Sequence, residues 1–372
     1  MTCANNDRKP GRDVYIDALR GLMLVTMTIH HFPSLFCDYT FESLGYVNAV
    51  EGFVFLSGLV AGRVYTRYGA VENGVLLWRR ALARTGFIYS FHVLTFLTLF
   101  SLAVLFSVKT WGLETWTPRF YEHPVSALLM GITLTYQPQF LDILPMYAVF
   151  ILTVPIAVQL AKKNRLGLLL LSSTVVWLLA QFGLGDYLNA ALSRFWPVDL
   201  GVFDIFGWQF IFVLGVCIGI RSTTDLIPRQ FRRLALIVCV VVAATLFSIR
   251  HGFILSDPRF KIESLSFIGS LGPIRLLNFT VFALLVQYAL SWLTENLVVK
   301  GLALLGRHSL EVFTFHIFLL FLFFGVFRTS QLKEVWVLLF VSSLFLPACL
   351  LERYHNPWRT WFSWLATGNK RF

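Results

Sequence analysis

The chain alternates long apolar runs with short polar segments. Charge-poor runs of about 20 residues recur, which is the length that an α-helix needs to cross a bilayer core. They predict ten spanning helices, at residues 14–36, 46–66, 85–107, 142–161, 166–185, 204–220, 234–250, 274–294, 308–327 and 334–351. The apolar segment 124–137 is shorter and predicts a re-entrant or interfacial helix.

Composition agrees with this pattern. The 372 residues are 57% hydrophobic and 14% charged, whereas soluble globular domains are about 25% charged. The first run is too long for a cleavable signal peptide and contains Asp17 and Arg20. We therefore expect an all-α integral membrane protein, with one transmembrane domain over 14–351 between tails at 1–13 and 352–372.

The distribution of positive charge predicts the orientation. Of the 31 Lys and Arg residues, 22 fall on the side that holds both termini, and cytoplasmic segments carry such an excess. Both termini are therefore expected in the cytoplasm. The net charge of +11 then reflects topology, so nucleic-acid binding is not indicated. The five cysteines lack metal-ligand or disulfide spacing, and Walker, dinucleotide-binding, zincin and G-x-S-x-G motifs are absent from the sequence.

The first apolar run holds unusual ionisable groups. Arg20 and His31 stand eleven residues apart, so on a helix they share one face and lie about 16 Å apart along the axis. Ionisable groups are costly inside a bilayer, which makes each a candidate for function. The sequence therefore predicts that Arg20 places a fixed cation near the cytoplasmic leaflet and that His31 places a titratable imidazole near the outer leaflet. His30 lies about 80° from that face and is the alternative base.

A second acidic group, Glu51, opens the next apolar run at a depth similar to that of His31. Gly58 and Gly62 lie within about 20° of Glu51, and such a stripe of small residues allows a neighbouring helix to approach closely. We therefore expect Glu51 to orient His31 for general-base catalysis. A buried structural ion pair between them is the alternative.

Arginines cluster at the cytoplasmic ends of the second and third runs, at Arg63, Arg67, Arg79, Arg80 and Arg84. Arginine binds phosphate through several donors in fixed geometry, so the cluster suits a coenzyme A thioester whose long arm extends along the first helix. Membrane anchoring is the simpler explanation for any one of these arginines. Within the first run, Asp17 at i−3 could neutralise Arg20.

Other polar residues in the apolar runs allow structural explanations. Ser57 could bind an acyl carbonyl, although a hydrogen bond to its own helix backbone is simpler. Arg307 and Glu311 stand at i,i+4, which predicts an ion pair at a helix start, and His308 beside them is a candidate substrate-binding residue. Packing is the favoured role of the lone, deeper histidines, His92 and His316.

These motifs resemble a known family. Arg20-x10-His31 resembles the signature of the acyltransferase family 3 membrane enzymes, and the Ser57-Gly58 ending resembles their second-span motif. A wider set of segments resembles the OpgC family: Asp17-Ala-Leu-Arg20-Gly, Glu51 to Gly58, Arg79-Arg80, Gln137 to Pro145, and Leu305-Gly-Arg307-His308-Ser309-Leu. The resemblance covers about residues 13–355.

The chain departs from the superfamily pattern at two places. It has Arg79-Arg80-Ala-Leu-Ala-Arg84 where Arg-Arg-x-x-Arg is common. It also has Asp142-Ile-Leu-Pro145 where the superfamily has an acidic pair, as expected of OpgC-like proteins.

The resemblance implies a bacterial inner-membrane O-acyltransferase. Such an enzyme moves an acyl group, succinyl or acetyl, from cytoplasmic acyl-CoA to a hydroxyl of a periplasmic glucan. His31 would be the base and Glu51 its orienting group, while the donor would bind Arg20, Ser57, His308 and the basic loop with Arg63, Arg80 and Arg84. No metal or permanently bound cofactor is implied, and a homo-oligomer is compatible with this function. A proton-coupled transporter or flippase for a lipid or sugar is the main alternative, and a scaffold subunit is a third.

Overall fold

A computed structural model describes residues 13–105, 117–196, 198–221, 231–254, 262–290 and 292–354. Of the expected tails at 1–13 and 352–372, residues 1–12 and 355–372 lie outside these ranges. The helices are α1 (Val14–His30), α2 (Leu35–Thr40), α3 (Ala49–Val71), α4 (Gly74–Leu105), α5 (Pro118–Glu122), α6 (Pro124–Ile132), α7 (Ile143–Lys162), α8 (Leu166–Gln181), α9 (Leu184–Leu192), α10 (Ile205–Arg221), α11 (Arg232–Arg250), α12 (Ile262–Leu265), α13 (Pro273–Leu290), α14 (Leu297–Arg307), α15 (Ser309–Thr329), α16 (Lys333–Ser343) and α17 (Phe345–Arg353). The expected all-α fold is confirmed, because the β pairing in the described ranges is one isolated bridge, between Tyr136 and Asp199.

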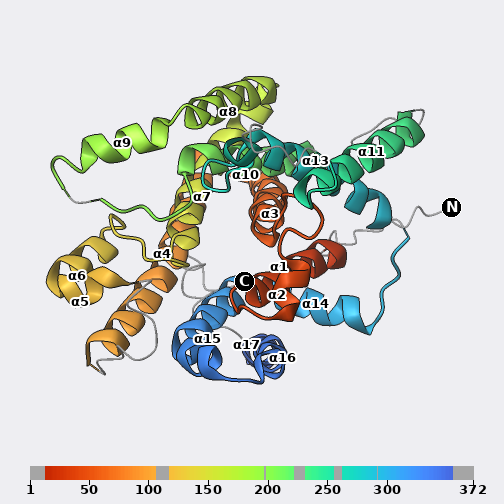
Figure 1. The fold of residues 1–372 in the computed structure, drawn as a ribbon. Coiled ribbons are helices and arrows are strands. Elements are labelled where there is room, and N and C mark those ends of the chain that lie inside the picture. Colours follow the sequence, from red (N-terminus) through yellow and green to blue (C-terminus); the bar gives the residue numbers. More distant parts are fainter. Residues whose placement is uncertain are drawn as a thin grey trace.

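Helix α3 lies near the centre of the molecule and packs against α1, α7 and α10 (Figure 1). Helices α4 to α6 lie on one side of α7, while α8 packs on α10 and leads into the outlying α9. Helix α14 runs along α1, and α15 to α17 lie beside that pair. Helices α11 and α13 form a separate edge.

Ten spanning helices are not confirmed. By length and composition, six helical segments in the described ranges could cross a membrane: α3, α4, α7, α11, α13, and α16 with α17 as one segment. Two bent pairs, α8–α9 at 71° and α14–α15 at 85°, raise the number to eight if each pair is one span. A chain with this many long apolar helices is a multi-pass membrane protein.

The expected runs and the observed helices differ where local chemistry ends a helix. The run 14–36 ends as a helix at His30, because Pro33 follows, and the residue before a proline disfavours the helical conformation. The run 166–185 breaks before α9 at Gly183, which has φ +83°. Helix α6 has nine residues and is too short to span, as expected for segment 124–137.

The expected small-residue stripe on α3 is a site of close helix packing. A Cβ atom on Gly58 would lie 2.2 Å from the carbonyl oxygen of Phe212, and one on Gly215 would lie 2.3 Å from that of Phe55. Gly62 approaches α10 in the same way. The helix that meets this stripe is therefore α10, so the stripe does not bring α1 and its histidine onto the Glu51 face.

Helix α1 makes its own backbone-to-backbone crossing with α14. A Cβ atom on Gly21 would lie 1.9 Å from the carbonyl oxygen of Leu302, and one on Gly306 would lie 1.8 Å from that of Asp17. Only glycine at both positions allows this approach. The crossing fixes the part of α1 that carries Arg20.

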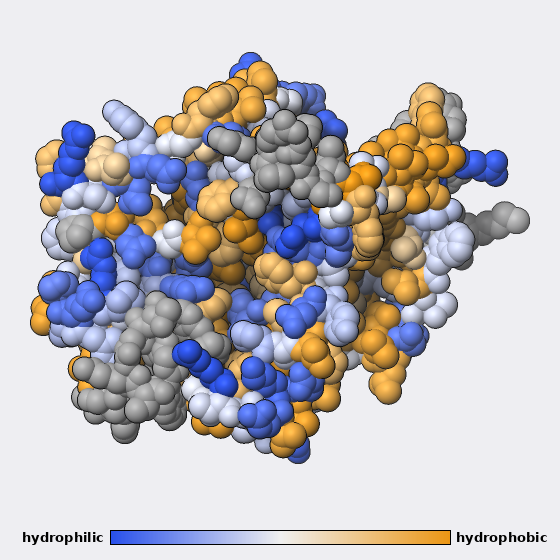
Figure 2. Space-filling view, in the orientation of Figure 1, coloured by the Kyte–Doolittle hydropathy of each residue, from blue (hydrophilic) through white to orange (hydrophobic). Residues whose placement is uncertain are grey.

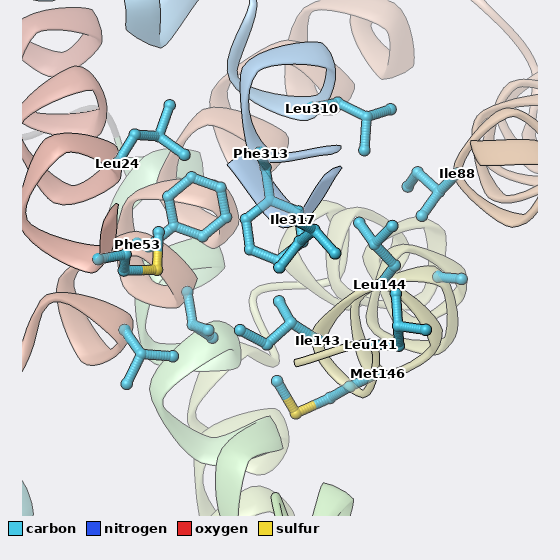
Figure 3. Close-up of a cluster of buried hydrophobic side chains, with 14 of the residues drawn as sticks. Leu24, Phe53, Ile88, Leu141, Ile143, Leu144, Met146, Leu310, Phe313 and Ile317 are labelled. Atoms are coloured by element: carbon cyan, nitrogen blue, oxygen red, sulfur yellow. The ribbon is translucent and has the colours of Figure 1, made fainter. Parts of the chain in front are cut away.

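A hydrophobic core fills the space between α1, α3, α4, α7 and α15 (Figure 3). Its buried side chains include Leu24, Phe53, Ile88, Leu144 and Phe313, one from each of these helices. Helix α11 lies at the edge of the molecule, and Figure 2 shows hydrophobic residues gathered along it. Only 11% of its most apolar stretch is buried, as expected of a helix that faces lipid.

Candidate functional site

Helix α15 contacts both ionisable residues of the α1 stripe. The Arg20 guanidinium donates to Ser309 Oγ at 2.5 Å. Further along, His31 Nδ1 lies 3.0 Å from His316 Nε2. Ser309 and His316 are seven residues apart and therefore lie within about 20° of each other on α15. The shared face expected of Arg20 and His31 is thus turned toward a neighbouring helix.

His31 directly follows the last residue of α1, and it is partly exposed. Its ring stacks on that of His316 with 5.1 Å between the centroids and an interplanar angle of 25°. The ring of Phe140, in the loop before α7, lies 4.5 Å away. His316 is 1% exposed, and its Nδ1 donates to the Phe313 carbonyl at 2.7 Å. These contacts hold the His31 imidazole in a half-buried position.

The neighbouring His30 has different surroundings. Its ring meets Phe41 edge-on at 5.3 Å, on the segment that follows α2. Its buried Nε2 has no hydrogen-bond partner among the described residues. His30 and His31 are therefore distinguished by their contacts, since only His31 is bonded to α15.

The expected contact between Glu51 and His31 is wrong. Glu51 Oε1 accepts from Arg275 at 2.7 Å, and Oε2 accepts from the Asn48 backbone N–H at 2.9 Å. Glu51 is 0% exposed and Arg275 is 3% exposed. A buried carboxylate needs a cation and hydrogen-bond donors nearby. Helix α13 supplies the cation, Arg275, and the N-terminus of α3 supplies the Asn48 N–H. The alternative, a structural ion pair, is present with Arg275 in place of His31.

Arg275 belongs to a larger ionic network that fixes the segment after α2. It donates to Glu42 at 2.5 Å and to the Ser266 carbonyl at 3.0 Å. Arg250, at the end of α11, also donates to Glu42, at 2.9 Å. Glu42 has φ +50°, and these contacts hold it there. The network joins α3, α11 and α13 to the loop between α2 and α3.

Ser57 is 2% exposed, and its hydroxyl has no hydrogen-bond partner among the described residues. The simpler expectation, a bond to its own helix backbone, is therefore not met. One turn before it, Phe53 stacks on Phe313 with 6.2 Å between the centroids. Helix α15 follows the direction of α1, and α3 runs opposite to α1. Ser57 and Ser309 therefore lie on the same side of this aromatic contact.

The arginines of α3 and α4 are not equally available to a ligand. Arg63 is paired with Asp13 at 2.9 Å. Arg80 forms a two-pronged ion pair with Glu72, in which Nε lies 2.8 Å from Oε2. Arg84 lies over the Phe87 ring at 5.3 Å, and no carboxylate pairs with it in the part of the chain that is described. Of these three predicted phosphate contacts, Arg84 has the least compensated charge.

His308 lies at the sharp bend between α14 and α15. Its Nε2 lies 2.9 Å from Glu352, which also pairs with Arg307 at 2.5 Å. Arg307 is the last residue of α14, whereas Glu311 lies in α15. The two residues are therefore on different helices, and the expected i,i+4 spacing on one helix is not present. The contacts of His308 connect the bend to the end of α17.

Several residues that define this region are not predicted as site residues by the sequence. Arg275 is the second residue of the apolar run 274–294, a position at which a charged residue usually only flanks a span. His316 was expected to be a packing residue, and Phe140 precedes the run that forms α7. The one available signal was that Arg275 and His316 are ionisable groups within or beside spans. No group of three or more His, Cys, Asp or Glu side chains is placed to hold a metal ion in the described ranges.

The fold and these contacts define a helical multi-pass membrane protein with ionisable side chains buried between α1, α3, α13 and α15. The chain matches the OpgC protein family over residues 12–356, and it belongs to that family. No curated protein and no solved structure matches it. Family membership supports glucan modification of the OpgC type and an acyltransferase-type enzyme.

Proposed function

We propose that this protein is an O-acyltransferase that moves an acyl group, succinyl or acetyl, from cytoplasmic acyl-CoA to a hydroxyl of an extracytoplasmic glucan. The observation that carries the proposal is the environment of His31. A partly exposed imidazole just after α1 is held by its hydrogen bond to a second histidine. A general base needs a fixed position and access to the proton that it removes.

In the proposed reaction, His31 removes the proton from the acceptor hydroxyl. The oxygen attacks the carbonyl carbon of the thioester, the carbon–sulfur bond breaks, and the coenzyme A thiolate leaves. The proton held by His31 then returns to the thiolate, so the imidazole is restored. No metal or resident cofactor takes part in these steps.

The donor would lie along α1, from the cytoplasmic side toward His31. Arg84, which has no carboxylate partner among the described residues, would bind the donor's phosphates. Arg63 and Arg80 would first have to give up their present carboxylate partners. Further in, the hydroxyl of Ser57 and the Arg20–Ser309 pair are polar groups suited to the donor's amide or carbonyl oxygens. We propose that the protein lies in the bacterial inner membrane, with both termini in the cytoplasm.

Release of coenzyme A from the purified protein tests this function. Succinyl-CoA or acetyl-CoA is supplied with and without a glucan acceptor, and free thiol is measured. We expect acceptor-dependent thiol release that falls by ~10²–10⁴ in His31→Ala, the usual cost of removing a general base. His30→Ala is the matched control, because the His30 ring meets Phe41 and its buried Nε2 has no hydrogen-bond partner among the described residues.

Two outcomes would contradict the proposal. Full activity in His31→Ala would remove the assigned base, and an equal defect confined to His30→Ala would move the assignment by one residue. Absence of thiol release from either acyl-CoA, in protein that is folded and supplied with glucan, would favour the transporter alternative.

A further inference from the structure

His31 and His316 form a short chain of imidazoles that ends on a backbone carbonyl. We infer that His316 is a positioning residue that fixes the His31 tautomer, keeping the proton on Nδ1 and the lone pair on Nε2. This inference rests on the proposed function only in naming the reaction that the tautomer serves. The tautomer itself follows from hydrogen bonds inside the protein.

The carbonyl of Phe313 sets the direction of the chain. A carbonyl oxygen only accepts, so the 2.7 Å contact requires a proton on His316 Nδ1. A neutral imidazole with its proton on Nδ1 has a lone pair on Nε2. The 3.0 Å contact with His31 Nδ1 therefore requires His31 to be the donor. Neutral His31 then has its lone pair on Nε2, the nitrogen that remains for an acceptor hydroxyl.

The same chain accommodates the charged intermediate of the reaction. When His31 takes a proton on Nε2, its Nδ1–H continues to donate to His316, and no proton has to move along the chain. The contact becomes a hydrogen bond from a charged donor, which is shorter and stronger than a neutral one. A carboxylate in this place would need its own compensating cation when His31 is neutral. His316 stabilises the imidazolium without that requirement.

Packing makes His316 suitable for this role. It is 1% exposed, and Phe313 lies one turn before it on α15. The ring of Phe313 meets that of His316 edge-on at 5.0 Å, and the Phe313 carbonyl holds its Nδ1. The imidazole is thus fixed to its own helix, and α15 is fixed to α1 at Ser309 through Arg20. His31 meets a partner whose orientation does not depend on solvent.

Two substitutions at His316 separate hydrogen bonding from packing. His316→Gln can place an amide oxygen near the position of Nε2 and keep an acceptor for His31. His316→Met fills a similar volume but offers only a weak sulfur acceptor. The control is His92→Met, because His92 is also fully buried, and its ring contacts the Gly131 carbonyl instead of a second imidazole.

We expect His316→Met to lower kcat by about ten- to a hundredfold, less than the ~10²–10⁴ expected for removal of the base itself. The KM for acyl-CoA should stay within about twofold, since His316 acts through His31 and not on the donor. His316→Gln should recover most of kcat. Equal losses in His316→Gln and His316→Met, or a loss in His92→Met as large as in His316→Met, would show a packing effect and overturn the inference.

Nitrogen NMR of the protein labelled with ¹⁵N-histidine provides a readout that needs no activity. The His31 signals are assigned by their loss in His31→Gln. We expect the wild-type signals to show a proton on Nδ1, and we expect a shift toward the Nε2-protonated form in His316→Met. An unchanged His31 tautomer in His316→Met would overturn the inference. If the wild type shows the expected tautomer but transfers no acyl group, the proposed function fails and the pairing of the histidines stands.

Discussion

Glu51 and His31 have different environments although both are ionisable groups near the ends of neighbouring helices. Glu51 is fully buried and has both oxygens bonded, one of them to Arg275. His31 is partly exposed and has one ring nitrogen bonded to a second imidazole. A buried carboxylate whose two oxygens already have hydrogen-bond partners has a structural role. An accessible imidazole can instead exchange protons with a substrate. The side chains are therefore expected to respond differently to substitution.

Glu51→Gln should lower the unfolding midpoint of the protein, and its effect on the rate of acyl transfer should be smaller. It weakens a buried ion pair and leaves Arg275 with Glu42 as its remaining carboxylate. Breaking such a pair costs about 3–5 kcal/mol when an uncompensated charge remains, and less here because Glu42 stays. Thermal unfolding in detergent measures the loss. A normal unfolding midpoint together with inactive enzyme would return Glu51 to catalysis.

Arg84→Gln should raise the KM for acyl-CoA, because Arg84 is the predicted phosphate contact without a carboxylate partner in the described residues. Arg63→Gln is the control, since Arg63 already pairs with Asp13. Initial rates over a range of acyl-CoA concentrations give both KM values. A larger effect of Arg63→Gln than of Arg84→Gln would place the phosphates elsewhere.

At the scale of elements, apolar runs located the helices well, and local breaks decided their ends. Pro33 and Gly183 each interrupt an apolar run, 14–36 and 166–185, that hydropathy predicts to be one continuous helix. The stripe of Gly58 and Gly62 correctly indicated a close helix approach, but the partner is α10. Periodicity reports the face of one helix and contains no information about which distant helix covers it. For the same reason the sequence placed Arg20 and His31 on one face but did not identify Ser309, His316 or Arg275 as partners.

Gly215→Ala should destabilise the α3–α10 contact. A Cβ atom there would lie 2.3 Å from the Phe55 carbonyl oxygen, which requires the two helices to separate. Gly167→Ala is the control, because a Cβ atom at that position has no atom within 4 Å. We expect a lower unfolding midpoint only for Gly215→Ala. Equal midpoints for the two variants would contradict the observed helix crossing.

At the scale of the whole molecule, the proposed function needs two sides of a membrane. Positive charge predicts which side is cytoplasmic, and the direction of α1 then places His31 toward the other side. Between the Arg20–Ser309 and His31–His316 contacts, hydrophobic side chains such as Leu24, Phe53 and Phe313 fill the interior (Figure 3). The donor's arm would have to enter this layer to bring its thioester to His31.

Acyl transfer in oriented membrane vesicles tests the central claim, that the donor binds from the cytoplasm and the acceptor is modified on the other side. Glucan is trapped inside inside-out vesicles that contain either the wild-type protein or His31→Ala, and labelled acyl-CoA is added outside. We predict labelling of the trapped glucan by the wild-type protein only, and no response of right-side-out vesicles to external acyl-CoA. Labelling in right-side-out vesicles alone, or equal labelling by His31→Ala, would contradict it.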